Sequence, residues 1–190
     1  MTPAETFRYL IENHVKRDGA KPLLEWIEKT DFFSAPASTR FHGSYPGGLC
    51  EHSIHVYEEL TRLLAVYPEI KPSAETVVII TLLHDLCKIG CYEQDIRNVK
   101  INGVWTQQPC YKFNEKYPFG THGGKSVYLI QRYMPLTAEE AVAINCHMGF
   151  SDKPQGDFSI GKAFEKYPLA WLLHVADESA SYIREKQEEI

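Results

Sequence analysis

The sequence predicts a mostly α-helical fold, a bundle of helices with one small β-hairpin inserted between them. Three observations carry this prediction. Apolar residues recur at helical spacing along most of the 190 residues. Thr and Ser stand where several of these segments begin, which is where helices prefer such residues. One segment instead alternates polar and apolar residues around Asn102-Gly103, a strong hairpin signal.

The helical segments follow one another with capping residues at their starts. Thr2 is the expected N-cap of the first, with Glu5 completing a capping box. Thr137 and Glu140 form the same pair further along, and Ser73 is expected to cap the fourth helix. Helices are expected over residues 2–15, 21–29, 49–66, 73–90, 123–134, 137–148 and 168–189.

Three segments lie outside this helical core. Residues 31–48 are rich in Ser, Pro and Gly and are expected to form a loop. Residues 92–119 contain the hairpin, which we expect to be a flap over a site because so long a helix-free segment is seldom a core element. The acidic end of the last helix, residues 184–189, is interpreted as an ordinary solvated helix end.

Composition favours a single domain over residues 1–190. The chain is 44% hydrophobic and 24% charged, with a net charge of −5. No basic stretch resembles a duplex-binding surface, so long nucleic acid is disfavoured as a partner. No apolar run is long enough to span a membrane, and the N-terminus lacks the pattern of a signal peptide. The expected location is the cytoplasm.

The five cysteines are odd in number and include no Cys-x-x-Cys pair, so reduced thiols are expected. Cys87 and Cys91 are four residues apart and could share a helix face as part of a soft metal site. Without a second close thiol pair, packing is the favoured interpretation of both.

The segment "TLLHDLCKIG", residues 81–90, places ionisable residues at the end of an otherwise apolar helix. An unpaired buried charge is very costly, so His84, Asp85 and Lys88 need partners. Adjacent residues point about 100° apart on a helix, so His84 and Asp85 can flank one ion. The two oxygens of Asp85 can also reach a second ion.

Other histidines and one more carboxylate stand at helix starts or on apolar helical segments. Each alone is more often a hydrogen-bonded core residue than a metal ligand. Together they bring an imidazole or carboxylate from several helices, and a shared divalent metal would supply the charge partner that all of them lack. These residues are His52, His122, His147, His174 and Asp177.

The segments "GGLCEHSIHV", "LLHDLCK", "GTHGGKS", "INCHMG" and "LLHVADESA" follow one another in an order that resembles the HD-domain superfamily of metal-dependent phosphohydrolases. The resemblance covers about residues 40–182. A single His-Asp pair is a weak signal, whereas the five-part order H…HD…H…H…D on helices is specific. The resemblance implies an HD-domain helical bundle around a two-metal centre.

The resemblance also implies which residues bind the two metals. The ligands implied for the first metal are His52, His84, Asp85 and Asp177, and those implied for the second are Asp85, His122 and His147. Nitrogen and oxygen ligands without a thiolate suit Mn, Fe, Ni, Co or Zn, and the sequence does not choose among these divalent transition metals.

Lys88 follows Asp85 by three residues and would lie beside the metals, which repel it. Its position is explained if the substrate is a small anion bearing a phosphate; a lysine that reaches solvent past the helix end is the alternative. Candidate substrate contacts are Lys88, Arg40, His42, Arg97 and Lys125, each with a solvated or packed side chain as its alternative. His55 and His174 are weighed in the same way as residues that orient His52 and Asp177.

The leading functional prediction is a phosphomonoesterase or phosphodiesterase acting on a nucleotide or similar small phosphate ester. A hydroxide activated by two metals would attack phosphorus, with Asp85 and Lys88 as the catalytic residues. The alternative is a diiron oxygenase, because the same ligand order with the following lysine also resembles myo-inositol oxygenase. A metal-binding regulator without turnover is a third possibility. The sequence identifies neither the substrate nor the oligomeric state.

Overall fold

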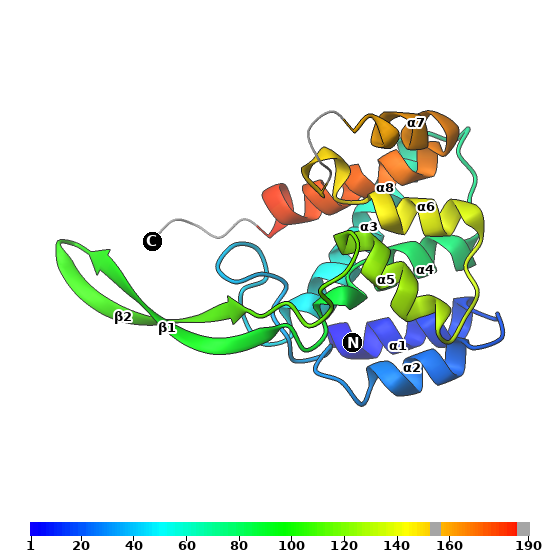
Figure 1. Cartoon of the computed structure of the whole chain (residues 1–190). Helices are drawn as coiled ribbons and strands as arrows, with labels where there is room; N and C mark the ends of the chain where they lie inside the picture. Colours follow the sequence, from blue (N-terminus) through cyan, green and yellow to red (C-terminus); the bar gives the residue numbers. More distant parts are fainter. Residues whose placement is uncertain (153–156, 186–190) are drawn as a thin grey trace.

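Eight α-helices and one two-stranded antiparallel sheet make up the part of the chain that this computed structural model describes, residues 1–152 and 157–185 (Figure 1). The fold is mostly α-helical, as predicted. The helices are α1 (Pro3–His14), α2 (Ala20–Ile27), α3 (Gly48–Val66), α4 (Ala74–Leu83), α5 (His122–Gln131), α6 (Ala138–Cys146), α7 (Ser159–Lys166) and α8 (Pro168–Ser179). Short 3₁₀ turns η1 (Leu86–Lys88) and η2 (Gly149–Asp152), a π-helix η3 (Ala180–Arg184), and strands β1 (Tyr92–Ile101) and β2 (Val104–Phe113) complete it.

Helices α3, α4, α6 and α8 form the centre of the bundle. Helix α3 packs against α4 and α8, and α6 packs against α8, α5 and α4. Every residue from Val77 to Leu83 in α4 is buried, as expected for a helix that is apolar on all sides. The elements that carry the predicted ligands therefore converge in the interior. Within the described residues, no helix combines the length and apolarity needed to cross a membrane.

The predicted helix starts are confirmed. The side chains of Thr2 and Thr137 each accept a hydrogen bond from the backbone N–H three residues later. The carboxylates of Glu5 and Glu140 in turn accept one from the backbone N–H of the capping threonine. Ser73 accepts from the backbone N–H of Thr76 at the start of α4.

Helices α4 and α8 end well before the predicted residues, and one further helix was not predicted. Helix α4 ends at Leu83 rather than continuing to residue 90, and a 3₁₀ turn follows at Leu86. Asp85 leaves the helical conformation, with φ −106° and ψ 18°. Helix α7, Ser159–Lys166, was not predicted; it has only eight residues, and only Ile160 among them is buried.

The hairpin forms as predicted but is not a flap. Asn102 and Gly103 both have positive φ, 50° and 84°, as the two-residue turn requires. Figure 1 shows both strands extending away from the helices as an arm. Ile96 and Trp105 are 64% and 70% exposed. At the base of the arm, the N–H of Tyr111 donates to the carbonyl of Thr39, in the loop at 31–48, at 3.3 Å.

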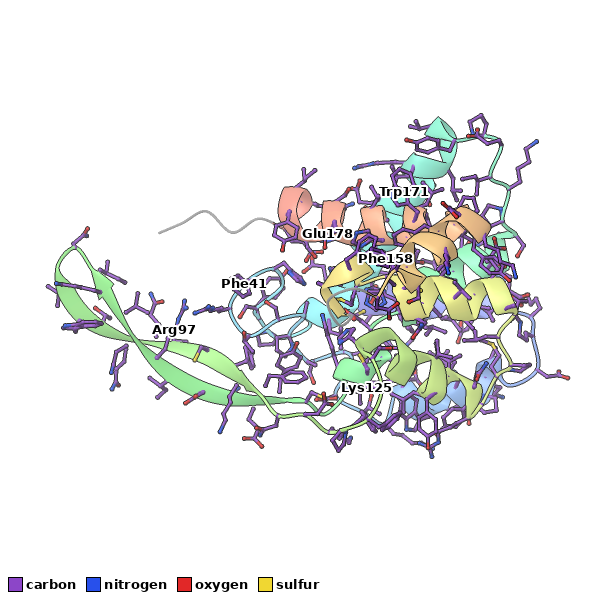
Figure 2. All side chains as sticks on the ribbon, turned by 45° about the horizontal axis from the view of Figure 1, so that its top comes forward. Phe41, Arg97, Lys125, Phe158, Trp171 and Glu178 are labelled. Carbon is purple, nitrogen blue, oxygen red and sulfur yellow. The ribbon has the colours of Figure 1, made fainter. Side chains whose placement is uncertain are left out.

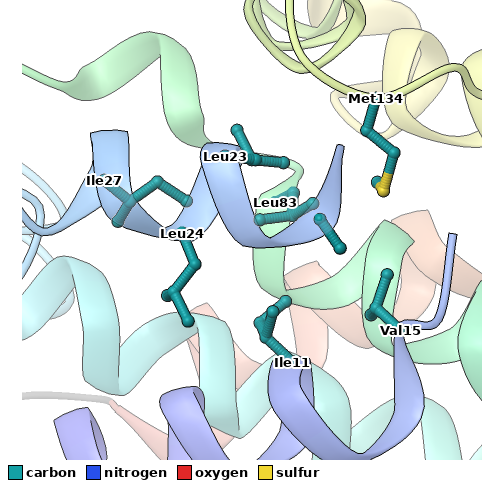
Figure 3. A pocket seen from close by; sticks show the side chains of 8 residues that line it. Ile11, Val15, Leu23, Leu24, Ile27, Leu83 and Met134 are labelled. Atoms are coloured by element: carbon teal, nitrogen blue, oxygen red, sulfur yellow. The ribbon is translucent and has the colours of Figure 1, made fainter. Parts of the chain in front are cut away.

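The first two helices pack against the end of α4 through apolar side chains. A small cavity remains between them (Figure 3). The cavity is lined by Ile11, Val15, Ala20, Leu23, Leu24, Ile27, Leu83 and Met134. None of these is a candidate ligand or substrate contact, so the cavity belongs to the core rather than to a site.

A buried ion pair connects the segment after α1 with helices α4 and α6. The guanidinium of Arg17, after α1, donates to both oxygens of Glu140 in α6 at 2.6 and 3.0 Å. The hydroxyl of Thr76 in α4 donates to the same carboxylate at 3.0 Å. Burial raises the pKa of Glu140, but the hydrogen bond from Arg17 and others outweigh burial and lower it below its usual 4.5.

Glu140→Gln is expected to lower the free energy of unfolding at pH 7 by about 2–3 kcal/mol, because it leaves Arg17 without its buried anionic partner. The folded-state pKa of Glu140 is depressed, so its contribution is present above the unfolded pKa and is lost as pH falls through the folded one. Urea unfolding should therefore show the difference from wild type shrinking below pH about 4.5. The variant Glu12→Gln, at an exposed position, is the control. An equal loss of unfolding free energy in both variants would contradict a stabilising role of the Arg17–Glu140 ion pair.

Candidate metal centre

The six predicted ligands come from five elements and meet in the interior of the bundle. His52 lies in α3, and His84 and Asp85 follow α4. His122 begins α5, His147 follows α6 directly, and Asp177 lies in α8. The exposed fractions are 1% for His52, 0% for His84 and His147, 2% for Asp85 and 9% for Asp177. The side chain of His122 is 22% exposed.

Two of the imidazoles are oriented by the ends of their own helices. His84 and His147 each follow the last residue of a helix, where backbone carbonyls lack intrahelical partners. The Nδ1 of His84 donates to the carbonyl of Thr81 at 2.7 Å, and the Nδ1 of His147 donates to that of Ile144 at 2.7 Å. A proton on Nδ1 leaves Nε2 of each neutral ring with a lone pair directed inward.

Asp85 lies between two groups of ligands. Its Oδ2 is 3.4 Å from Nε2 of His84 and 3.9 Å from Nε2 of His52. Its Oδ1 is 2.7 Å from Nε2 of His122 and 3.6 Å from Nε2 of His147. The Asp177 ligand group, as we name it, consists of His52, His84, Asp177 and Oδ2 of Asp85. The His122 ligand group consists of His122, His147 and Oδ1 of Asp85. Asp85 thus faces both groups with separate oxygens.

The buried Nε2 atoms of His52, His84 and His147 have no hydrogen-bond partner. Asp177 Oδ1 is 3.1 Å from Nε2 of His52 but lacks the alignment of a hydrogen bond. Nitrogen lone pairs and carboxylate oxygens that converge without bonding one another suit a cation placed among them. Sets of three such residues, among them His52 with His84 and Asp85, and His84 with His147 and Asp177, have ligand atoms within 4.8 Å of one another. The residues present therefore fit a metal ion.

The charges of the centre are strongly coupled. Burial disfavours the protonated ring of His52, but the carboxylates of Asp177 and Glu185 outweigh burial and raise its pKa to about 9. Burial likewise opposes ionisation of Asp85, yet Lys88 and His84 hold its pKa well below the usual value. Burial also opposes ionisation of Asp177, but His52 outweighs burial and lowers the pKa of this carboxyl. Both carboxylates are therefore anionic at neutral pH.

Lys88 has partners within the protein, which the sequence analysis did not foresee. Its Nζ lies 2.7 Å from Asp85 Oδ2 and donates to the carbonyl of Ala37 at 2.8 Å. The side chain is 13% exposed, so the lysine does not extend to solvent past the helix end. Tyr92 donates to the same carbonyl at 3.0 Å. Lys88 therefore links the centre to the loop at 31–48.

Cys87 lies beside His122 and is a potential ligand, although packing was the favoured interpretation of this residue. Its Sγ lies 3.3 Å from Nε2 of His122, and Asp85 offers an oxygen to the same cluster. The prediction considered Cys87 only together with Cys91, whose thiol instead donates to the backbone carbonyl of Cys87 at 3.2 Å. Burial raises the pKa of Cys87. All five cysteines are free thiols, as expected.

The predicted substrate contacts occupy different environments. The ring of His42 lies tilted beside that of His52, with ring centroids 4.9 Å apart, and its buried Nε2 is unpartnered. Arg40 is exposed and lies over the ring of Phe41. Figure 2 shows Arg97 on the hairpin arm, apart from the helices. Lys125 pairs with Glu115 at 2.5 Å. Of these four, only His42 is brought into contact with a ligand.

The residues weighed as orienting groups also have partners. His174 donates from Nδ1 to the carbonyl of His147 at 2.6 Å, so it supports a different ligand from the one predicted. His55 Nδ1 lies 2.7 Å from Glu185 Oε1. Glu185 belongs to the segment expected to be solvated, but its side chain is 3% exposed. That expectation was wrong at Glu185; residues 186–189 lie outside the described residues.

No model of a known protein family matches the chain, and comparisons with curated proteins and with solved structures also find no match. The centre therefore has to be interpreted from its own geometry.

Gly123 allows the start of α5 to approach the end of α6. A Cβ at this position would overlap the carbonyl of Ile144, the same carbonyl that orients His147. It would also lie 2.8 Å from Cα of Asn145. Since both neighbours are backbone, neither can move aside cheaply. The close approach brings His122 and His147 together, with ring centroids 5.4 Å apart.

Gly123→Ala should lower the free energy of unfolding by about 1–3 kcal/mol, because the two helices must separate. It should also weaken metal binding by the His122 ligand group. Gly161→Ala is the matched control, since a Cβ there meets nothing within 4 Å, and in a helix it should be neutral or stabilising by up to about 1 kcal/mol. Urea unfolding of both variants checks this. Equal stability of the two would exclude the proposed close packing.

Proposed function

We propose that the protein is a metal-dependent phosphohydrolase, acting as a phosphomonoesterase or phosphodiesterase on a nucleotide or other small phosphate ester. Two divalent ions would share Asp85, one bound by each ligand group. Ions bound there would supply a hydroxide nucleophile near neutral pH and polarise a phosphoryl group. The order of ligands along the chain, which resembles the HD-domain superfamily, supports this class of reaction.

One observation carries the proposal: the buried Nε2 atoms of His52, His84 and His147, which have no hydrogen-bond partner, converge on the carboxylates of Asp85 and Asp177. A purely structural cluster would satisfy its polar atoms internally. The two oxygens of Asp85 favour two ions over one, because Oδ2 lies nearest to His84 whereas Oδ1 lies nearest to His122.

Lys88 is the residue of this chain best placed to act on an anionic substrate. Its ammonium lies against the shared carboxylate, and Asp85 raises its pKa despite burial, so it is charged at neutral pH. Two ions beside Asp85 would repel it, and a substrate phosphate between them would balance the charge. A donor fixed in this way stabilises charge that develops on phosphoryl oxygens.

The purified protein is expected to hold close to two transition metals per chain. Asp85→Ala should lose both metals and all activity, because Asp85 serves both groups. His147→Ala should mainly lose the metal of the His122 ligand group. Elemental analysis after reconstitution with Mn²⁺ measures the metal content of both variants. Arg97→Ala, on the hairpin arm, is the control. If the His147 variant kept two metals and normal turnover, the assignment of that ligand would fail.

The reaction class is tested by assaying reconstituted protein on p-nitrophenyl phosphate and bis(p-nitrophenyl) phosphate, followed by a panel of nucleotides, cyclic dinucleotides and sugar phosphates. Phosphate or alcohol release under argon with Mn²⁺ supports the hydrolase. Iron dependence with substrate-dependent O₂ uptake would overturn it in favour of the oxygenase.

Lys88→Met should lower kcat/KM on the best ester by about 10²-fold or more, with metal content unchanged. The metal-free variant should also be less stable than wild type, because Asp85 and the carbonyl of Ala37 lose a partner. Thermal unfolding and steady-state kinetics give the two results. Lys71→Met, which changes an exposed lysine that is not a candidate substrate contact, is the control with normal kcat/KM. Near-normal turnover of the Lys88 variant would exclude its catalytic role.

A further inference from the structure

Glu185 reaches the centre from the segment that follows α8. Its Oε1 lies 3.1 Å from Nδ1 of His52 and its Oε2 lies 3.2 Å from the same nitrogen. His55, one turn further along α3, bonds Oε1 at 2.7 Å. The carboxylate is thus held by two imidazoles of α3, on the side of His52 opposite the ligand nitrogen Nε2.

His52 differs from the other inward-facing imidazoles in its place along a helix. His84 and His147 follow helix ends and donate to free carbonyls of their own helices. His52 lies within α3, Gly48–Val66, where the backbone carbonyls are engaged in the helix. Its Nδ1 therefore needs an acceptor from another element, and Glu185 supplies it.

The π-helix η3 brings Glu185 into this position. The N–H of Glu185 donates to the carbonyl of Ala180 at 2.9 Å, the five-residue spacing of a π-turn. The preceding residue, Arg184, pairs with Glu58 and Glu59 of α3, so it fixes the same segment without touching a ligand. The segment is therefore joined to α3 by two separate contacts, of which only one reaches the centre.

We infer that Glu185 is a positioning residue of the metal centre: its carboxylate holds the proton of His52 on Nδ1 and so directs Nε2 at the metal of the Asp177 ligand group. The inference rests on the proposed metal centre. Carboxylates that bind the outer nitrogen of a ligating histidine fix its tautomer and ring orientation, and their loss typically weakens metal binding about 10–100-fold. His55 supports Glu185 in this role.

Titration calorimetry with Mn²⁺ tests the inference on the metal-free full-length chain. Glu185→Ala should weaken binding by the Asp177 ligand group about 10–100-fold and leave the His122 ligand group unchanged. Glu185→Gln, whose amide oxygen still accepts the Nδ1 proton, should recover most of the affinity. Arg184→Ala, which loses only the contacts to Glu58 and Glu59, should bind both metals as wild type does.

Nitrogen-15 NMR of the Zn²⁺-loaded protein gives a second readout that general destabilisation would not produce. The Nδ1 proton of His52 should exchange slowly in wild type and Glu185→Gln, and rapidly in Glu185→Ala. The inference about Glu185 would be overturned by wild-type metal affinity in Glu185→Ala. It would also be overturned by an equal loss of affinity at both ligand groups that Glu185→Gln does not restore. Either result would leave the proposed metal centre standing. Failure of the wild-type protein to bind metal would instead overturn the proposed centre.

Discussion

A nitrogen lone pair and a carboxylate oxygen repel each other when both are buried and no proton or cation lies between them. The interior of this bundle places Nε2 of His52, His84 and His147 around Asp85 and Asp177, and none of the three nitrogens has a hydrogen bond. Protonation relieves part of the repulsion, as the raised pKa of His52 indicates. Divalent ions would relieve it more completely, because each is coordinated by several of these atoms at once. The remaining features of the structure are understandable as ways of holding this arrangement.

The ends of helices position several of these side chains. Helices α4 and α6 stop directly before His84 and His147, and the carbonyls freed there orient both rings. Gly123 lets α5 begin against the end of α6, which adds His122. Lys88 connects Asp85 to Ala37, so the loop that adjoins the centre is joined to the carboxylate that both ligand groups share. Helices α4 and α6 end where a carbonyl is needed, whereas α3 continues and relies on Glu185.

Much of the fold was predictable from the sequence, and so was the gathering of the six candidate ligands, for identifiable reasons. Capping residues such as Thr2 and Thr137 act locally, so their roles are readable from the chain alone. The six candidate ligands stand out because ionisable residues on apolar helices need a partner. The end of α4 at Leu83 was not readable, because the hydrophobic run continues through Leu86 while His84 and Asp85 adopt their conformations through tertiary contacts. Glu185 was missed because a π-turn shifts every later residue from the helical pattern, and the partners of Lys88 because Ala37 is distant in sequence.

The most direct test of the central claim is the anomalous diffraction of a crystal grown with Mn²⁺. The account predicts two strong peaks flanking the Asp85 carboxylate, one bound by His52, His84 and Asp177 and the other by His122 and His147. A single peak that does not touch Asp85, or an ion-free cluster at saturating Mn²⁺ with protonated imidazoles paired to both carboxylates, would contradict it.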